Sequence, residues 1–154
     1  MAKLYHEIVD LLEKTKADIQ AQMSSQNINA SGRTSDSFRV VQTDGHIMLV
    51  MGGEGTAPLA TLEIGRGAGK IPYGFIDILV EWSIAKGIYF PDNRQRKTFA
   101  WFLSQKIKDK GTLRHTAPKD IYSTIVHDAV EQLKPMIVQA VKDNFKSTRK
   151  KPTP

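Results

Sequence analysis

The fold class of this chain is decided by the stretch Phe38-Arg39-Val40-Val41-Gln42-Thr43-Asp44-Gly45-His46-Ile47-Met48-Leu49-Val50-Met51. Two β-prone runs lie on either side of Asp44-Gly45, and Asp-Gly between such runs is one of the stronger local signals for a hairpin. The second run is nearly continuous in apolar character, which predicts a well-covered strand. The stretch therefore predicts a small antiparallel sheet.

Helical patterns precede and follow this hairpin. From Ala2 to about Met23, apolar residues keep the spacing of one helix face, which predicts an amphipathic N-terminal helix. After Pro72, a second pattern predicts a core helix that stops at Lys86-Gly87. The intervening segment 59–64 fits either a helix or a strand. The predicted core residues of the second helix are Phe75, Ile78, Leu79 and Trp82.

Two further helices are predicted in the second half of the chain. One pattern covers residues 99–107 and stops at Lys110-Gly111 in the same lysine-glycine manner. The other begins near Lys119, and Pro135 inside it removes a backbone donor and predicts a kink. The whole pattern predicts an α+β fold. It combines an N-terminal amphipathic helix, a small antiparallel sheet with a hairpin, and three further helices including a long kinked C-terminal helix.

Length and charge predict one domain followed by a basic tail. The 154 residues suffice for one compact domain with one core, placed at residues 1–143. Residues 142–154 carry +4 of the net charge of +6, so the body is nearly neutral. The tail, residues 144–154, is predicted to be flexible and is either a solvated end or an electrostatic arm. The cations of the candidate arm are Lys146, Arg149, Lys150 and Lys151.

The sequence lacks the motifs of enzymes and cofactor sites. The absence of cysteine excludes disulfides, thiolate nucleophiles and cysteine-ligated metals, and the four histidines lack the spacing of metal ligands. The glycine-rich run 65–70 does not fit a phosphate loop, because Ile64 and Ile71 stand where glycine and serine or threonine are needed. No apolar run reaches the roughly 18 residues of a membrane span. We therefore expect a protein with no catalytic, cofactor or metal residues, no small-molecule substrate and no membrane partner.

Charged residues around the glycine-rich run are the candidate contacts between chains. Glu63 and Glu81 could act as paired carboxylates in acid–base chemistry, but an ion pair with Arg66 or Lys70, buried or at an interface, is favoured. Arg66 and Lys70 have no evident catalytic partner, and Trp101 points away from the apolar stripe of its helix. The candidate inter-subunit contacts are Glu63, Arg66, Lys70 and Trp101.

A series of short motifs resembles a known family. The first is Ala57-Pro58-Leu59-Ala60-Thr61-Leu62-Glu63-Ile64-Gly65-Arg66-Gly67-Ala68-Gly69-Lys70-Ile71-Pro72. In the same order follow Trp82, Lys86-Gly87-Ile88, Phe99-Ala100, Lys106-Ile107, Lys110-Gly111-Thr112 and Asp120-Ile121-Tyr122. Together they span roughly residues 30–125, and the set resembles the tail-completion or neck proteins of tailed phages and prophages. Leu59 and the stretch 89–96 depart from the pattern.

This resemblance implies a structural virion protein without catalytic activity, assembled in the host cytoplasm. It would form a homo-oligomeric ring at the head–tail junction or the tail top, in contact with other neck, connector or tail proteins. DNA in the channel is a further candidate partner. The alternative is a small basic nucleic-acid-binding accessory protein, which is motivated by the tail and the isoelectric point of about 9.6.

Overall fold

The computed structural model describes residues 2–28, 32–52, 59–113 and 120–149, and it confirms the predicted α+β fold. The N-terminal helix, the hairpin and the later helices occur in the predicted order, and the segment 59–64 is a helix. The elements are α1 (Ala2–Ser25), α2 (Arg33–Asp36), β1 (Phe38–Thr43), β2 (His46–Met51), α3 (Leu59–Ile64), α4 (Phe75–Ala85), α5 (Asn93–Lys110) and α7 (Ser123–Arg149).

The hairpin forms in the predicted register. Strands β1 and β2 pair antiparallel, from Phe38 opposite Met51 to Thr43 opposite His46. The sheet has two strands and packs against α1, so β2 is less covered than the sequence predicts. Met48 in its middle is 43% exposed. Its apolar run faces α1 on one side only, because the described elements provide no second layer over the sheet.

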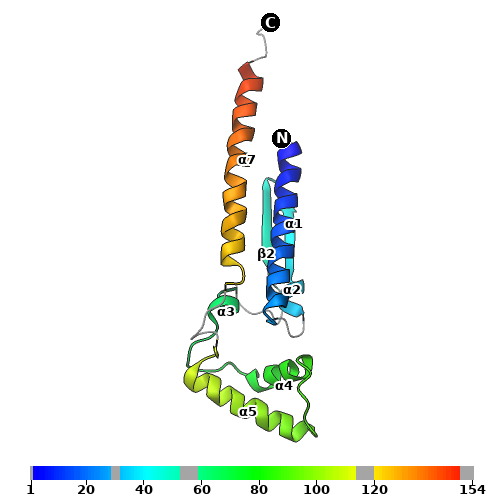
Figure 1. The fold of residues 1–154 in the computed structure, drawn as a ribbon, viewed down its shortest axis with the longest axis vertical. Coiled ribbons are helices and arrows are strands. Elements are labelled where there is room, and N and C mark those ends of the chain that lie inside the picture. Colours follow the sequence, from blue (N-terminus) through cyan, green and yellow to red (C-terminus); the bar gives the residue numbers. More distant parts are fainter. Residues whose placement is uncertain (1, 29–31, 53–58, 114–119, 150–154) are drawn as a thin grey trace.

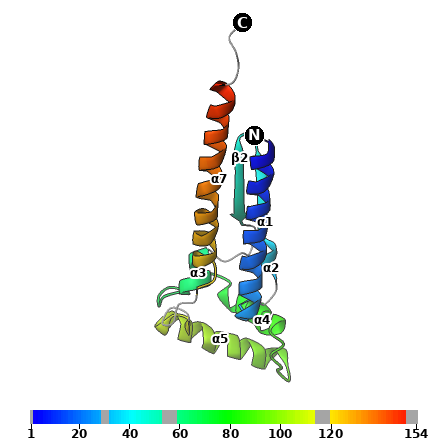
Figure 2. The same ribbon diagram turned by 45° about the horizontal axis from the view of Figure 1, so that its top comes forward.

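The molecule is elongated, and among the described residues most buried apolar side chains form two clusters, where the sequence predicts a single core. Helix α1, the hairpin and α7 form one end, and α4 and α5 cross below it (Figures 1 and 2). The first cluster consists of Ile19, Met23, Phe38 and Ile121. The second lies between α4 and α5 and consists of Leu79, Ala100 and Ile107. The helical hairpin of α4 and α5 therefore has an apolar core of its own.

Polar contacts join the α4–α5 hairpin to the rest of the chain. The Lys86 ammonium on the C-terminal side of α4 donates to the backbone oxygen of Asn27 at 2.7 Å and to its side-chain oxygen at 2.8 Å. Arg33 in α2 forms an exposed salt bridge of 3.2 Å with Glu81 in α4. Where the sequence predicts one continuous apolar core, these polar contacts hold the α4–α5 hairpin to Asn27 and α2.

Only part of the predicted core of α4 is buried. Leu79 is 7% exposed and Phe75 packs beside it, whereas Ile78 is 50% and Trp82 is 37% exposed, so these two predictions are wrong for the isolated chain. The side of α4 that faces α5 includes Ser83, which is fully buried. Because a serine side chain is small, α5 can approach α4 closely at this position. The apolar residues on the other sides of α4 are not covered by α5.

The burial difference on α4 predicts unequal effects of truncation. Leu79→Ala is expected to lower the free energy of unfolding by about 3 kcal/mol, because it leaves a cavity in the α4–α5 core. Trp82→Ala should cost less, although the side chain is larger, because more of it already contacts solvent. Chemical denaturation of both variants measures the difference. A larger loss for Trp82→Ala would contradict this assignment of the core.

Helix α7 is a single element of 27 residues that continues through Pro135 to Arg149. The predicted domain limit at residue 143 therefore falls inside the helix. Figure 1 shows its last turns extending beyond the N-terminal end of α1. Residues 144–149 of the predicted tail are thus helical. The helix also continues without interruption through Pro135, where the sequence predicts a kink.

Candidate functional site

Glu63 in α3 caps the N-terminus of α7. Its Oε1 accepts hydrogen bonds from the backbone N–H groups of Ile121 at 3.0 Å, Tyr122 at 2.7 Å and Ser123 at 2.7 Å. Its Oε2 accepts a further hydrogen bond from the hydroxyl of Ser123. The first N–H groups of a helix have no partner within the helix, and a carboxylate there also interacts favourably with the helix dipole. Glu63 therefore holds α3 to α7.

This environment changes the ionisation of Glu63. The side chain is 9% exposed, and burial alone would raise its pKa. The hydrogen bonds from the Ser123 hydroxyl and from the three backbone amides outweigh burial, so the pKa of Glu63 is lowered. Burial, and then the neighbouring negative charge of Glu63, raise the pKa of Tyr122. Among the described salt bridges none involves Glu63, so the ion pair with Arg66 or Lys70 that the sequence predicts does not form within the chain.

The glycine-rich segment after α3 packs across the C-terminal end of α5. The N–H of Gly69 donates to the carbonyl of Lys108 at 2.8 Å. The N–H of Arg66 donates to the hydroxyl of Thr112 at 2.9 Å, and the N–H of Thr112 donates to the carbonyl of Arg66 at 2.8 Å. The amides of Arg66 and Gly69 therefore make contacts within the chain, which agrees with the sequence argument against a phosphate loop.

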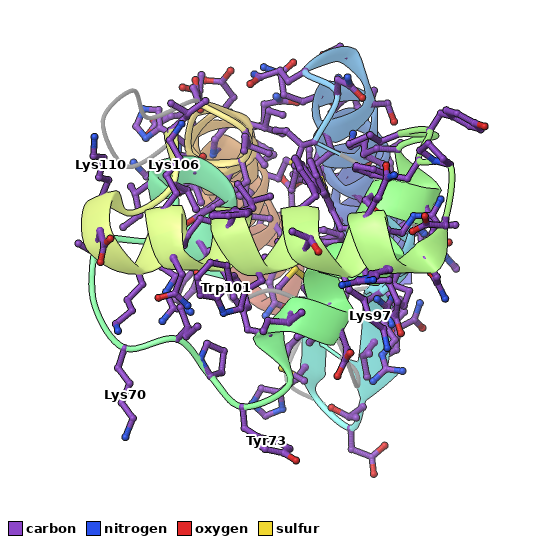
Figure 3. The ribbon with its side chains drawn as sticks, turned by 90° about the horizontal axis from the view of Figure 1, so that it is seen from below. Lys70, Tyr73, Lys97, Trp101, Lys106 and Lys110 are labelled. Atoms are coloured by element: carbon purple, nitrogen blue, oxygen red, sulfur yellow. The ribbon has the colours of Figure 1, made fainter. Side chains whose placement is uncertain are left out.

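The side chains of the two cations of this segment differ in their contacts within the chain. The Arg66 guanidinium donates to the carbonyl of Lys70 and lies over the ring of Phe75, 5.4 Å from its centroid. The side chain of Lys70 is exposed. Figure 3 shows it projecting from the loop on the side of α5 where Trp101 lies. Trp101 is 47% exposed and meets Phe102 edge-on at a centroid distance of 4.9 Å. Of the four predicted contact residues, Lys70 and Trp101 are thus accessible to a partner.

Helix α7 exposes an apolar surface along one of its sides. We call it the outer stripe of α7. While Ala129 is buried, the residues of the stripe are between 39% and 71% exposed. Apolar residues therefore extend around the helix beyond the part that α1 covers. The outer stripe consists of Val126, Val130, Ile137, Val141 and Phe145.

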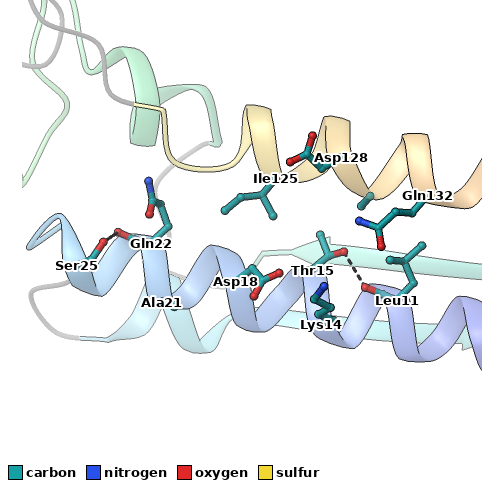
Figure 4. A pocket seen from close by; sticks show the side chains of 11 residues that line it. Leu11, Lys14, Thr15, Asp18, Ala21, Gln22, Ser25, Ile125, Asp128 and Gln132 are labelled. Carbon is teal, nitrogen blue, oxygen red and sulfur yellow. Dashed lines mark hydrogen bonds between the residues drawn. The ribbon is translucent and has the colours of Figure 1, made fainter.

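A groove runs between α1 and α7 (Figure 4). Polar side chains of both helices line it, with Lys14 and Asp18 on α1 and Asp128 on α7. The hydroxyl of Thr15 donates to the carbonyl of Leu11 at 2.7 Å and is satisfied within α1. Within the described ranges, no three His, Cys, Asp or Glu side chains could hold a metal ion together. The groove thus brings charged, hydroxyl and apolar side chains of the two helices together.

The candidate electrostatic arm is described only in part. Lys146 is exposed in α7, and Arg149 is the last residue of that helix. Lys150 and Lys151 lie outside the described residues. None of the helices in the described part of the chain is long and apolar enough to span a membrane.

The sequence could not indicate the contact between Glu63 and α7. The two partners are separated by about sixty residues, and the polar residues at the start of α7 suggested only that a helix begins there. Comparisons of the chain with protein families, with curated proteins and with solved structures gave no match. The assignment of function therefore rests on the residues and their arrangement.

Proposed function

We propose that this chain is a structural, non-enzymatic virion protein that assembles as a ring of identical subunits at the head–tail junction or tail top of a tailed phage. The resemblance to tail-completion and neck proteins, over roughly residues 30–125, suggests the location. The observation that carries the proposal is the outer stripe of α7, whose apolar residues are left uncovered by the described part of the chain. Contiguous exposed apolar surface of this kind marks interaction sites.

The geometry of α7 suits repeated contacts between copies. A helix of 27 residues is about 40 Å long, which offers a continuous edge to a neighbour. The exposed large apolar residues of α4, which are Ile78, Trp82 and Ile84, lie at the other end of the elongated chain. Two separate apolar surfaces on one subunit allow a head-to-tail contact, in which each copy binds two neighbours, and such contacts form a ring when the rotation from copy to copy closes.

The same surfaces favour assembly over catalysis. Stable interfaces bury roughly 800 Å² per partner, and their centres are rich in apolar and aromatic residues. The groove between α1 and α7 has a mixed polar and apolar lining, and the hydroxyl of Thr15 in it is bonded to the backbone of α1. Other neck, connector or tail proteins would be further partners of the assembled ring.

The outer stripe predicts a test of assembly. Replacing both Ile137 and Val141 with glutamate should shift the protein from an oligomer to a monomer of 17.2 kDa, because two charges would have to be buried at the interface. Sedimentation velocity measures the mass of both proteins. The control, Lys142→Gln, changes the charge of an exposed α7 residue outside the stripe and should leave the oligomer intact.

Two results would contradict the proposal. The first is a wild-type protein that stays monomeric over the whole accessible concentration range and is absent from purified phage particles. The second is a double variant that remains folded and keeps the wild-type mass. In that case the outer stripe would not form the interface, and the α4 surface would have to be examined by the same method.

A further inference from the structure

Helix α5 carries an unusually dense positive charge. Its 18 residues include six basic residues and one acidic residue, Asp109. The helix is about 27 Å long, and its cations form two groups, one before Thr98 and one after Gln105. These positive charges are separate from those of the basic C-terminal tail, residues 144–154. The basic residues are Arg94, Arg96, Lys97, Lys106, Lys108 and Lys110.

Exposed aromatic rings lie among these cations. Lys97 and Trp101 are one helical turn apart on α5, and Figure 3 shows both on the side where Lys70 and Tyr73 project from the preceding loop. Trp101 is 47% exposed, and Tyr73 is fully exposed. We call Lys70, Tyr73, Lys97 and Trp101 the lower face of the molecule. Lys106 and Lys110 extend from the other side of α5 in the same view.

The cations of the lower face are not neutralised within the described part of the chain. The salt bridges observed there involve neither Lys70 nor Lys97. Two acids of the adjoining segments have partners of their own. Asp92 accepts a hydrogen bond from the N–H of Gln95 at 2.7 Å as the cap of α5, and Glu81 pairs with Arg33. The positive charge therefore remains available to an anionic partner.

We propose that the lower face binds single-stranded nucleic acid. The ammonium groups of Lys70 and Lys97 contact phosphates, while unpaired bases stack on Trp101 and Tyr73. Non-specific binding of single-stranded nucleic acid requires cations along the nucleic-acid backbone and aromatic rings on which the bases stack. Lysine is depleted in the centres of protein–protein interfaces, so a polyanion fits this face better than a second protein does. The inference does not depend on the proposed ring.

The test uses the full-length protein and a fluorescent oligothymidylate of about 16 nucleotides. Affinity should fall steeply with salt, and Lys70→Gln and Lys97→Gln should each reduce the slope of log affinity against log salt by about 0.7. Trp101→Ala should weaken binding by between about 5-fold and 150-fold, and Trp101→Phe should restore most of the loss. Lys142→Gln removes an exposed charge from α7. Its affinity for the oligonucleotide should fall less than that of either lower-face lysine variant.

Three outcomes would overturn the inference. The first is equal affinity of Trp101→Ala and wild type, because stacking would then play no part. The second is displacement of the oligonucleotide by polyglutamate at equal charge concentration, or equally tight binding of a duplex of the same length, since general charge attraction would suffice. The third is a change in the mass of Trp101→Ala in sedimentation, which would assign this residue to a subunit interface.

Discussion

Replacing Glu63 with alanine is expected to lower the free energy of unfolding by about 3 kcal/mol. The side chain is 9% exposed and accepts four hydrogen bonds from the start of α7. Hydrogen bonds to a charged group contribute about 1.5–3 kcal/mol, and the amides lose a buried partner when the carboxylate is removed. Urea unfolding followed by circular dichroism measures the loss.

The control for this variant is Glu81→Ala. Glu81 is also a glutamate, but its partner is the side chain of Arg33, and both side chains of this salt bridge are more than half exposed. Such pairs typically contribute about 0–1 kcal/mol. Similar losses for the two variants would contradict the structural role of Glu63 as the cap of α7.

The lowered pKa of Glu63 adds a pH dependence to the same prediction. A carboxyl whose pKa is lower in the folded state contributes stability above its unfolded value of 4.5, and this contribution is lost as the pH falls through the folded value. The stability difference between wild type and Glu63→Gln should therefore shrink below pH 4.5. A difference that stays constant from neutral to acidic pH would contradict this linkage.

Replacing Gly111 with alanine is the second change with a large expected effect, about 3 kcal/mol of lost stability. Gly111 has a φ of +76°, which disfavours any residue with a side chain. A Cβ atom here would lie 2.5 Å from the carbonyl oxygen of Arg66 and 3.0 Å from the amide nitrogen of Ala68. Both contacts are with backbone atoms, so relief requires the glycine-rich segment to move away from α5.

Gly87→Ala is the matched control for Gly111. Gly87 follows α4 after a lysine, as Gly111 follows α5, and its φ is +66°. An added Cβ atom at Gly87 would meet nothing within 4 Å, so only the backbone penalty of about 1–2 kcal/mol remains. The difference between the two glycines in denaturant unfolding isolates the steric contact. Equal losses would contradict the packing of the glycine-rich segment on α5.

The outer stripe of α7 and the lower face are different parts of the molecule, whereas the α4 surface, the second surface proposed for the ring, lies at the same end as the lower face. The outer stripe of α7 lies at one end and the lower face at the other. Variants in one surface should therefore leave the other property unchanged, because distant sites without shared partners behave nearly independently. The alternative function considered from the sequence, nucleic-acid binding through the tail, is separated from the lower face by comparing Lys97→Gln with a deletion of residues 147–154.

Local pattern was sufficient to predict most of the secondary structure. Asp44-Gly45 predicts a turn because its φ and ψ preferences suit a hairpin, and the helical periods predict α1, α4, α5 and α7. Lysine-glycine pairs predicted the ends of α4 and α5 for the same local reason. These features depend on residues within a few positions of one another, which is the range in which a sequence carries its own information.

Tertiary structure alone decided which residues the elements bury. Trp82 and Ile78 keep the spacing of a core face, but only α5 covers α4 among the described elements, so both remain exposed. Glu63 appeared to be a charged contact for another chain until α7 was brought beside it, because a capping bond across some sixty residues leaves no local pattern. Gly111 and Gly87 have the same local sequence signal, and only the backbone packed over Gly111 makes one of them sterically indispensable.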